Sequence, residues 1–219
     1  MPFKIFSKNI ESFTIGAFLT VICLIVLVLT PSITAATADG DIAAFRNNQV
    51  VLYNTKMHPK AKGIHLKLPY PRSWIAEEGR HPNVVKKFKT HDGNHMISTL
   101  ILIKNSPIKK NFSSAQINSE NFRKSIAEGL GTYFESGATQ VDGENAIWIF
   151  YVQNFSLPTA NIRAYFLTYI VNFHGKMVLL MHGVGGAAED LILKEKFYSY
   201  MPLFQTITSN VIFPDKWIN

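Results

Sequence analysis

The chain has 219 residues, of which 47% are hydrophobic and 17% charged, enough apolar material for one domain of ordinary size. It carries 22 Lys and Arg residues against 15 Asp and Glu, a formal net charge of +7 at pH 7. The single cysteine, Cys23, lies in an N-terminal apolar run, so the rest of the chain has neither a disulfide framework nor a cysteine nucleophile.

The first 38 residues have the pattern of a secretory signal peptide. Lys4 and Lys8 precede an apolar stretch over residues 13–29, and a small-residue A-x-A site ends at Ala38. We expect residues 1–38 to be removed after Ala38, which would make the protein periplasmic or secreted. The alternative is an uncleaved inner-membrane anchor, because the apolar stretch approaches the roughly 20 residues that span a membrane. The domain would then contact the membrane only through this N-terminal segment.

Residues 39–61 are predicted to form a lead-in segment ahead of the domain. Within it, residues 49–54 have the composition of a short edge strand. The alternation of apolar and polar residues over 64–68 predicts a strand with one solvated face. Pro69 and Pro71 are expected to end this strand, because proline has no N–H to donate to a ladder.

A hairpin and a helix follow in the middle of the chain. Two strands, over residues 84–90 and 96–103, are expected to be joined by a turn at Gly93. Residues 113–116 fit a capping box, in which a Ser oxygen and a Gln amide satisfy the free N–H groups of a first helical turn. The apolar residues that follow fall on one face of this helix, whose end is expected between Gly129 and Gly131.

The most apolar part of the sequence is a predicted hairpin over residues 162–182. Its first arm, residues 162–173, is apolar on both faces, which predicts a central strand that is covered on both sides. The return arm, residues 176–182, is equally apolar, and Gly175 supplies the positive φ that a tight turn requires. Residues 146–152 form a similar apolar run and predict another buried strand.

A closing helix is predicted over residues 191–211, where large apolar residues recur at spacings of three and four. Glu189 and Asp190 suit the partial positive charge of its first turn. Pro202 is expected to kink the helix or divide it in two. The glycine run 183–186 is expected to let the preceding strand turn sharply into the helix. As an anion-binding loop it lacks both the dinucleotide fingerprint and a P-loop lysine.

This order of elements predicts an α+β fold, a mostly antiparallel sheet flanked by two main helices. The domain would cover residues 62–213, followed by a short tail over 214–219. The stretch Leu68-Pro69-Tyr70-Pro71-Arg72-Ser73-Trp74 resembles the opening of the PsbP-like domains. That fold group also includes the Mog-type Ran-binding proteins and bacterial envelope proteins of the DcrB and LpqN kinds. The resemblance implies a PsbP-like sandwich that does accessory or binding work without a shared active site, and it assigns no functional residue.

Charge is distributed unevenly along the chain. Residues 56–110 contain twelve basic against three acidic residues, a net of +9, whereas residues 111–219 contain seven basic and nine acidic residues. A one-sided basic surface attracts anionic partners. We therefore predict a non-enzymatic accessory protein that docks an envelope protein or an anionic envelope surface. The candidate partner-binding residues are Lys86, Lys87, Lys89, Lys104, Lys109 and Lys110. A solvated lysine face is the alternative, and nucleic acid is not an expected partner of an exported protein.

A small-ligand or metal-binding module is the alternative function. The candidate ligands are His65, His81, His91 and His95, because imidazole nitrogens bind zinc and copper. Their spacing matches no metal-site signature, and histidines in surface loops are the commoner explanation, so no cofactor is expected. Catalysis is not expected either, because the chain has no G-x-S-x-G motif and its acidic pairs are simple neighbours in sequence.

Overall fold

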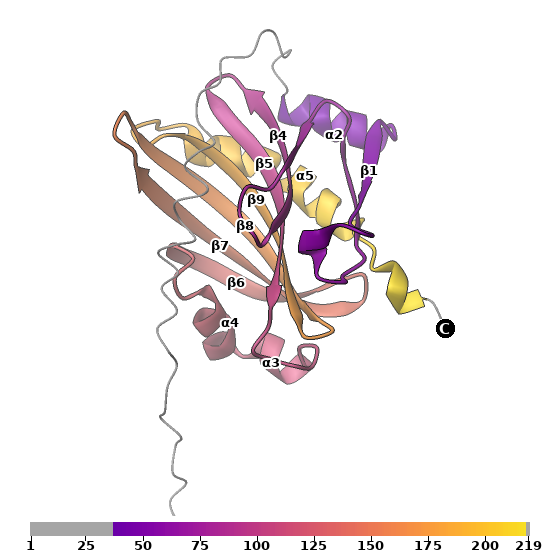
Figure 1. Cartoon of the computed structure of the whole chain (residues 1–219). Helices are drawn as coiled ribbons and strands as arrows, with labels where there is room; N and C mark the ends of the chain where they lie inside the picture. Colours follow the sequence, from indigo (N-terminus) through magenta and orange to yellow (C-terminus); the bar gives the residue numbers. More distant parts are fainter. Residues whose placement is uncertain (1–36, 218–219) are drawn as a thin grey trace, which may run out of the picture.

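One seven-stranded sheet forms the frame of the molecule (Figure 1). The computed structural model describes residues 37–217. The strands pair antiparallel throughout, in the order β3-β4-β5-β9-β8-β7-β6. They are β3 (Ile75–Glu78), β4 (Val84–Asp92), β5 (His95–Asn105), β6 (Thr132–Val141), β7 (Glu144–Ser156), β8 (Asn161–Phe173) and β9 (Lys176–Ala187).

A two-stranded ribbon and several helices complete the described chain. The ribbon pairs β1 (Val50–Asn54) with β2 (Lys67–Pro71). The α-helices are α2 (Ala38–Arg46), α3 (Ser114–Asn118), α4 (Glu120–Ala127) and α5 (Leu193–Ser209), and the 3-10 helices are η2 (Pro59–Ala61) and η3 (Pro214–Trp217). The predicted α+β fold with a mostly antiparallel sheet is therefore confirmed.

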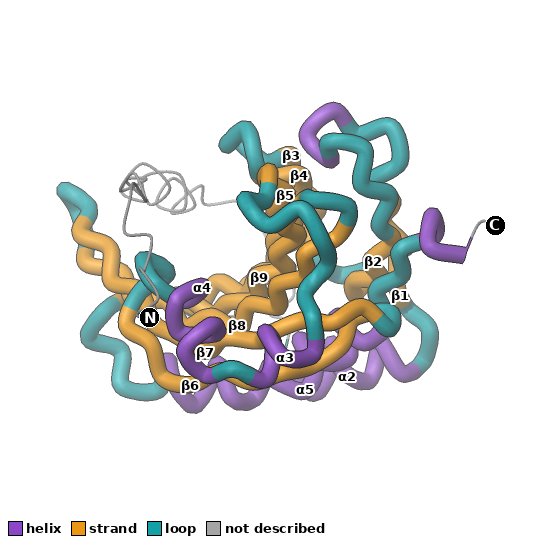
Figure 2. Tube along the Cα trace, turned by 90° about the horizontal axis from the view of Figure 1, so that it is seen from below, coloured by secondary structure: helices purple, strands orange, loops and turns teal. Residues whose placement is uncertain are grey.

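The predicted hairpin, β8–β9, lies inside the sheet with a hydrophobic core on each face. Tyr165, Leu167 and Tyr169 belong to the core that contains the buried side of α5. Phe166 and Ile170 point the other way, into the core that α3 and α4 cover. Figure 2 shows α2 and α5 on one side of the sheet and α3 and α4 on the other. Both faces of β8 are thus covered, as its two-sided apolar sequence predicts.

The glycine-rich stretch after the hairpin is part of β9 and not a turn into a helix. Gly183 pairs with Phe166, and Gly185 lies two residues further along the same ladder. A Cβ atom on Gly183 would lie 2.7 Å from two atoms of the Phe166 ring. Glycine therefore lets this ring lie across the strand, and β9 continues to Ala187.

The closing helix, α5, is continuous from Leu193 to Ser209, with Pro202 inside it. The expectation of two abutting helices is therefore wrong. Phe197 and Phe204 are fully buried, and the burial of this stripe outweighs the backbone bond that proline cannot make. Because α5 starts at Leu193, Glu189 and Asp190 precede it rather than occupying its first turn.

The predicted mid-chain helix is two short helices. The capping box is present, since Ser113 Oγ accepts from Gln116 N at 3.2 Å and Gln116 Oε1 accepts from Ser113 N at 2.9 Å. The chain becomes extended at Ser119, whose side chain accepts from Phe122 N and caps α4. Ser favours such a cap over a helix interior because its hydroxyl competes for backbone groups.

Strand β2 runs through both prolines that were expected to end the preceding strand. Lys67 donates its N–H to Ile212 O, on the side away from β1. Pro69 and Pro71 lie two and four residues further along, so their nitrogens face that same side. Neither proline therefore has to donate to β1, and the ribbon forms without a lost ladder bond.

The expected lead-in is packed against the domain. Asp41 of α2 is 3% exposed, and its carboxylate accepts from Trp74 Nε1 at 2.8 Å and from Ser73 Oγ at 3.0 Å. The expected cleavage bond after Ala38 falls at the first residue of α2. Residues 1–36, which carry the predicted signal peptide or anchor, lie outside the described part of the chain. None of the helices within residues 37–217 is long and apolar enough to cross a membrane.

Candidate binding site

The predicted lysines of β4 are ion-paired with the neighbouring edge strand. The register of β3 and β4 places Glu77 opposite Lys87 and Glu78 opposite Lys86. Lys89 Nζ lies 2.6 Å and Lys87 Nζ 3.9 Å from oxygens of Glu77, and Lys86 donates to Glu78 Oε1. Half of the six candidate lysines therefore have a carboxylate partner, which weakens the field that they present to an anion.

Lys87 is the most buried of these three lysines. Its exposed fraction is 7%, and burial lowers its pKa to about 8. The charges of Lys89 and Arg80 also contribute to this lowered pKa, and the attraction of Glu77 opposes them only in part. Lys87 is therefore part of the sheet's packing rather than of a surface that a large partner could touch.

The other candidate lysines lie at the end of the sheet where β8 turns into β9. Lys104 lies near the end of β5, beside the first residues of β9, and Lys109 and Lys110 are exposed in the segment that leads to α3. Lys176 begins β9, and Lys62 is the C-cap of η2. We name these five residues the hairpin-end basic surface. Within residues 37–217, none of the described ion pairs involves Lys62, Lys109, Lys110 or Lys176.

Hydrogen bonds hold the segment 106–111 against the hairpin. Asn172 donates from Nδ2 to Ile108 O at 2.7 Å and to Lys110 O at 2.5 Å. Ser106 donates its N–H to Gly175 O at 3.0 Å. Because these bonds join the segment to the turn, Lys109 and Lys110 are kept at the same end of the molecule as Lys176.

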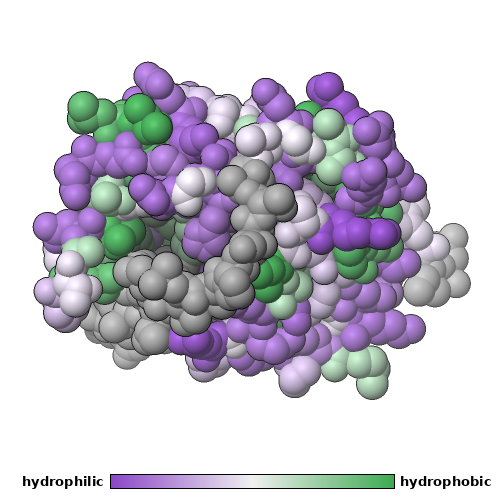
Figure 3. Space-filling model, turned by 90° about the horizontal axis from the view of Figure 1, so that it is seen from above, coloured by the Kyte–Doolittle hydropathy of each residue, from purple (hydrophilic) through white to green (hydrophobic). Residues whose placement is uncertain are grey.

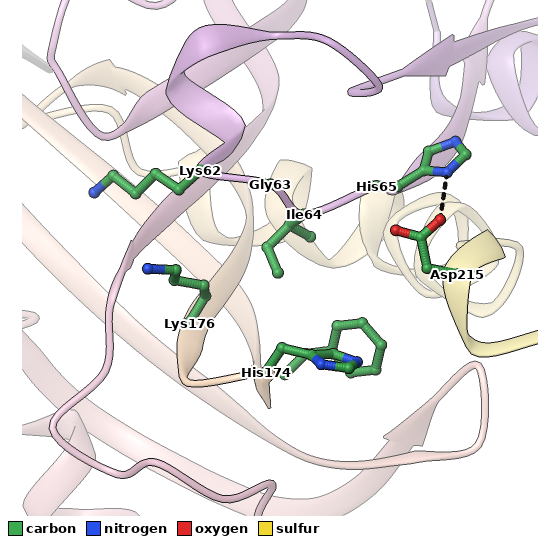
Figure 4. A pocket seen from close by; sticks show the side chains of 8 residues that line it. Lys62, Gly63, Ile64, His65, His174, Lys176 and Asp215 are labelled. Atoms are coloured by element: carbon green, nitrogen blue, oxygen red, sulfur yellow. Dashed lines mark hydrogen bonds and ion pairs between the residues drawn. The ribbon is translucent and has the colours of Figure 1, made fainter.

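A pocket of about 190 Å³ opens beside this surface (Figure 4). It is lined by Lys62, Gly63, Ile64, His65, Phe173, His174, Lys176 and Asp215. Segment 62–65 lies along one side and the β8–β9 turn along the other, and the side chains of Lys62 and Lys176 extend toward the same end. The volume is below the roughly 300–1,000 Å³ of pockets that enclose drug-sized ligands. It therefore suits one small chemical group.

The two lysines of the pocket are bonded to neutral amides. Lys62 Nζ donates to Asn83 Oδ1 at 2.6 Å, and Lys176 Nζ donates to Asn105 Oδ1 at 2.8 Å. Burial and then the charge of Lys176 lower the pKa of Lys62. An amide oxygen carries no net charge, so this end of the pocket keeps two uncompensated ammonium groups.

The opposite end of the pocket carries a carboxylate. His65 Nδ1 lies 3.0 Å from Asp215 Oδ1. Asp215 belongs to η3, which Asp142 fixes by accepting from Phe213 N at 2.8 Å and from Trp217 Nε1 at 3.2 Å. Residues 214–217 of the predicted tail are thus held against the domain, and Asp215 lines one side of the pocket.

The four histidines that were candidate metal ligands occupy different places: His65 beside the pocket, His81 in the β3–β4 turn, His91 near the end of β4 and His95 at the start of β5. His91 pairs with Met96 in the β4–β5 register, one position away from His95, so their side chains point to opposite faces. Within residues 37–217, no group of three or more His, Cys, Asp and Glu residues is arranged to hold a metal ion.

Several of the described histidines are hydrogen-bonded to carboxylates or to buried hydroxyl groups. His65 and His95 are each bonded to a carboxylate, the latter to Asp190 at 2.7 Å. His182 lies near two hydroxyl groups, those of Thr99 and Thr208, but it is fully buried. Nucleophilic catalysis needs a hydroxyl that a substrate can reach, so the hydroxyl groups beside the buried His182 are poorly placed for it.

The face of the molecule drawn in Figure 3 shows no extended apolar surface among its described residues. Viewed from above, the described surface is mostly hydrophilic, and apolar residues lie in separate patches among polar ones (Figure 3). The hairpin-end basic surface and its pocket are therefore the strongest candidate site in residues 37–217. Lys62 and Lys176 were not among the predicted residues, because they lie 114 positions apart in the sequence and neither belongs to a run of basic residues.

No protein-family model and no curated protein matches this chain. Among solved structures, the chain is similar to the crystal structure of LpqN, a protein involved in cell envelope biogenesis of Mycobacterium tuberculosis. The sequence identity is 13% and the TM-score 0.43, over 81% of this chain and 97% of that chain. A likeness at this level carries no inference about function, and the resemblance to the PsbP-like group stays a prediction.

Proposed function

We propose that this chain is an exported, non-enzymatic accessory protein that docks an anionic surface of the cell envelope through the hairpin-end basic surface. The main observation behind the proposal is that the lysines fall into two sets, one with carboxylate partners and one without. Those of β4 have carboxylate partners on β3, whereas Lys62, Lys109, Lys110 and Lys176 have none within the described residues. Unpaired charge at one end of a molecule both attracts and orients an anionic partner.

The exported location rests on the leader pattern of the sequence, and the non-enzymatic role on the side-chain arrangement described above. A docking role needs no buried catalytic group. It needs exposed cations on a rigid support, and Lys109 and Lys110 are exposed on a segment bonded to the central hairpin. Outside the cytoplasm, anionic lipid head groups and wall polymers are the surfaces that such cations meet.

The test compares two pairs of substitutions with the same change in charge. Lys109→Gln/Lys110→Gln removes two unpaired charges, and Lys86→Gln/Lys89→Gln removes two paired ones. Near an anionic membrane each lysine contributes about 1 kcal/mol, so the first variant should bind phosphatidylglycerol-containing vesicles at least tenfold more weakly, at about 1.4 kcal/mol per factor of ten. The second should lose much less, because its partners Glu77 and Glu78 already offset those charges.

Co-sedimentation at low and at moderate salt, with phosphatidylcholine vesicles as the neutral control, measures the effect. Binding should weaken as salt rises, because exposed charges are screened. Equal losses in the two variants would contradict the assignment of the surface. Failure of the wild-type protein to bind anionic vesicles would reject an anionic membrane as the partner and favour an acidic protein.

A further inference from the structure

The pocket at the hairpin end has two ammonium groups at one side and no arginine among its lining residues. Planar carboxylates are commonly recognised by the fork of an arginine, whereas lysine binds phosphate as a compact point charge. Lys62 and Lys176 come from separate elements, η2 and β9, and each can turn three N–H donors toward a tetrahedral ligand.

We infer that this pocket binds a single phosphate monoester group, held between Lys62 and Lys176. The inference deepens the proposed function and rests on it: the broad basic surface attracts the anionic partner, and the pocket selects one group on it. A phosphate monoester carries a charge of about −1.5 to −2 at pH 7, which matches two unpaired ammonium groups better than a carboxylate or a phosphodiester does.

The remaining lining residues fit a group that is attached to something larger. The pocket is open to solvent, and His174 is exposed at its rim, so the bridging oxygen of an ester can leave toward the outside. Ile64 and Phe173 are buried and give the pocket an apolar floor. Phe173 stacks on Phe213 with ring centroids 4.7 Å apart, which fixes this floor relative to the C-terminal segment.

Substitution of Asp215 should raise the affinity of the pocket for anions, whereas loss of its lysines should lower it. Its carboxylate lies in the same pocket and repels an incoming anion, while its only described polar partner there is His65. Asp215→Asn keeps an oxygen that can accept from His65 and removes the negative charge. Anion affinity should therefore rise by about threefold, within the range measured for single charges near a protein surface.

The experiment is a chemical-shift titration of the ¹⁵N-labelled protein, at constant ionic strength, with inorganic phosphate, glycerol phosphate, sulfate or acetate. We expect saturable shifts at residues 62–65 and 173–176 with both phosphates, similar shifts with sulfate as a tetrahedral dianion, and much weaker shifts with acetate. Lys62→Gln/Lys176→Gln should reduce phosphate affinity at least tenfold, since each lost hydrogen bond involves a charged group. Lys86→Gln/Lys89→Gln, the matched control outside the hairpin-end basic surface, should stay within about twofold, because Glu78 and Glu77 already pair with these lysines.

Several results would overturn the inference: acetate binding as tightly as phosphate, shifts centred on β4, or unchanged affinity in both Lys62→Gln/Lys176→Gln and Asp215→Asn. The aspartate variant keeps the test decisive if the double lysine variant does not fold.

A competition experiment distinguishes a lipid head group from a free phosphate ester as the source of the phosphate. It measures binding to vesicles that contain phosphatidate, with soluble glycerol phosphate as the competitor. Vesicle binding that persists without any phosphate binding would reject the pocket and leave the proposed function standing. Phosphate binding without any vesicle binding would reject the docking surface and leave the phosphate site standing.

Discussion

His182 shows how a titratable side chain is accommodated inside this fold. Its Nδ1 lies 2.9 Å from Thr99 Oγ1 and its Nε2 2.7 Å from Thr208 Oγ1, and its ring stacks on Phe204. Burial lowers the pKa of His182 to about 3. The ring is therefore neutral at pH 7, with one nitrogen donating and the other accepting, and the two hydroxyl groups can complete both bonds.

This burial makes the stability of the fold sensitive to acid. Between the ordinary pKa of 6.5 and about 3, the unfolded state binds a proton at His182 that the folded state does not. The free energy of unfolding therefore falls as the pH decreases through this window. At 1.36 kcal/mol per pKa unit, the loss between pH 6.5 and pH 4 is about 3 kcal/mol. His182→Gln keeps a donor and an acceptor without this titration, so its urea-unfolding free energy should depend less on pH. An identical pH dependence in the two proteins would contradict the prediction.

At the scale of elements, two glycines of β9 should respond in opposite ways to substitution by alanine. A Cβ at Gly183 would lie 2.7 Å from the Phe166 ring, whereas at Gly185 the nearest atom, Cβ of Ala164, would be 3.5 Å away. Gly183→Ala should therefore destabilise the protein by about 1–3 kcal/mol through overpacking. Gly185→Ala should be neutral or stabilising by up to about 1 kcal/mol, because it reduces the entropy of the unfolded chain. Denaturant midpoints with unchanged slopes measure both effects, and equal losses would show that the strand tolerates neither side chain.

The elements that the sequence predicts well are those whose side chains are buried. The apolar residues of β7, β8 and β9 face two cores, so their pattern alone predicts central strands. The edge strands β3 and β6 carry no such signal. β3 has four residues, two of them acidic, and half of the residues of β6 are exposed. Their formation depends on partners supplied by β4 and β7, which a local pattern cannot reveal.

The missed edge strand also explains why the candidate site was only half predicted. Counting charges along the sequence assigns +9 to residues 56–110, but it cannot show that β3 brings Glu77 and Glu78 beside the lysines of β4. Nor can a count of charges show that Lys62 and Lys176 line the same pocket. They do so because the segment after η2 lies beside the end of the central hairpin. Lys109 and Lys110 remain predicted partner-binding residues, and the spacing of lysines along the sequence could not predict which residues lie beside them.

At the scale of the whole molecule, the sheet has a centre and a periphery of different expected stability. β9 and β8 are paired on both edges and covered on both faces. By contrast, α3 and α4 each contain a single buried residue, Ile117 and Ala127. Sub-global openings start where few apolar contacts must be broken. The two helices should therefore open without the sheet, while the support of the basic surface stays folded.

Hydrogen exchange followed by mass spectrometry tests this division. Amides of β8 and β9 should exchange only through global unfolding, and those of α3 and α4 through local openings that are much more frequent. Val178→Ala provides the internal control, because Val178 is buried in the core on the α5 side of the sheet, so its truncation lowers the global free energy without changing the packing under α3 and α4. Exchange in β8 and β9 should accelerate by the factor that corresponds to its loss of stability, about tenfold per 1.4 kcal/mol, and exchange in α3 and α4 should not change. Equal acceleration in both regions would mean that the helices open only with the sheet, so that the second core and the segment carrying Lys109 and Lys110 unfold as one unit with the hairpin.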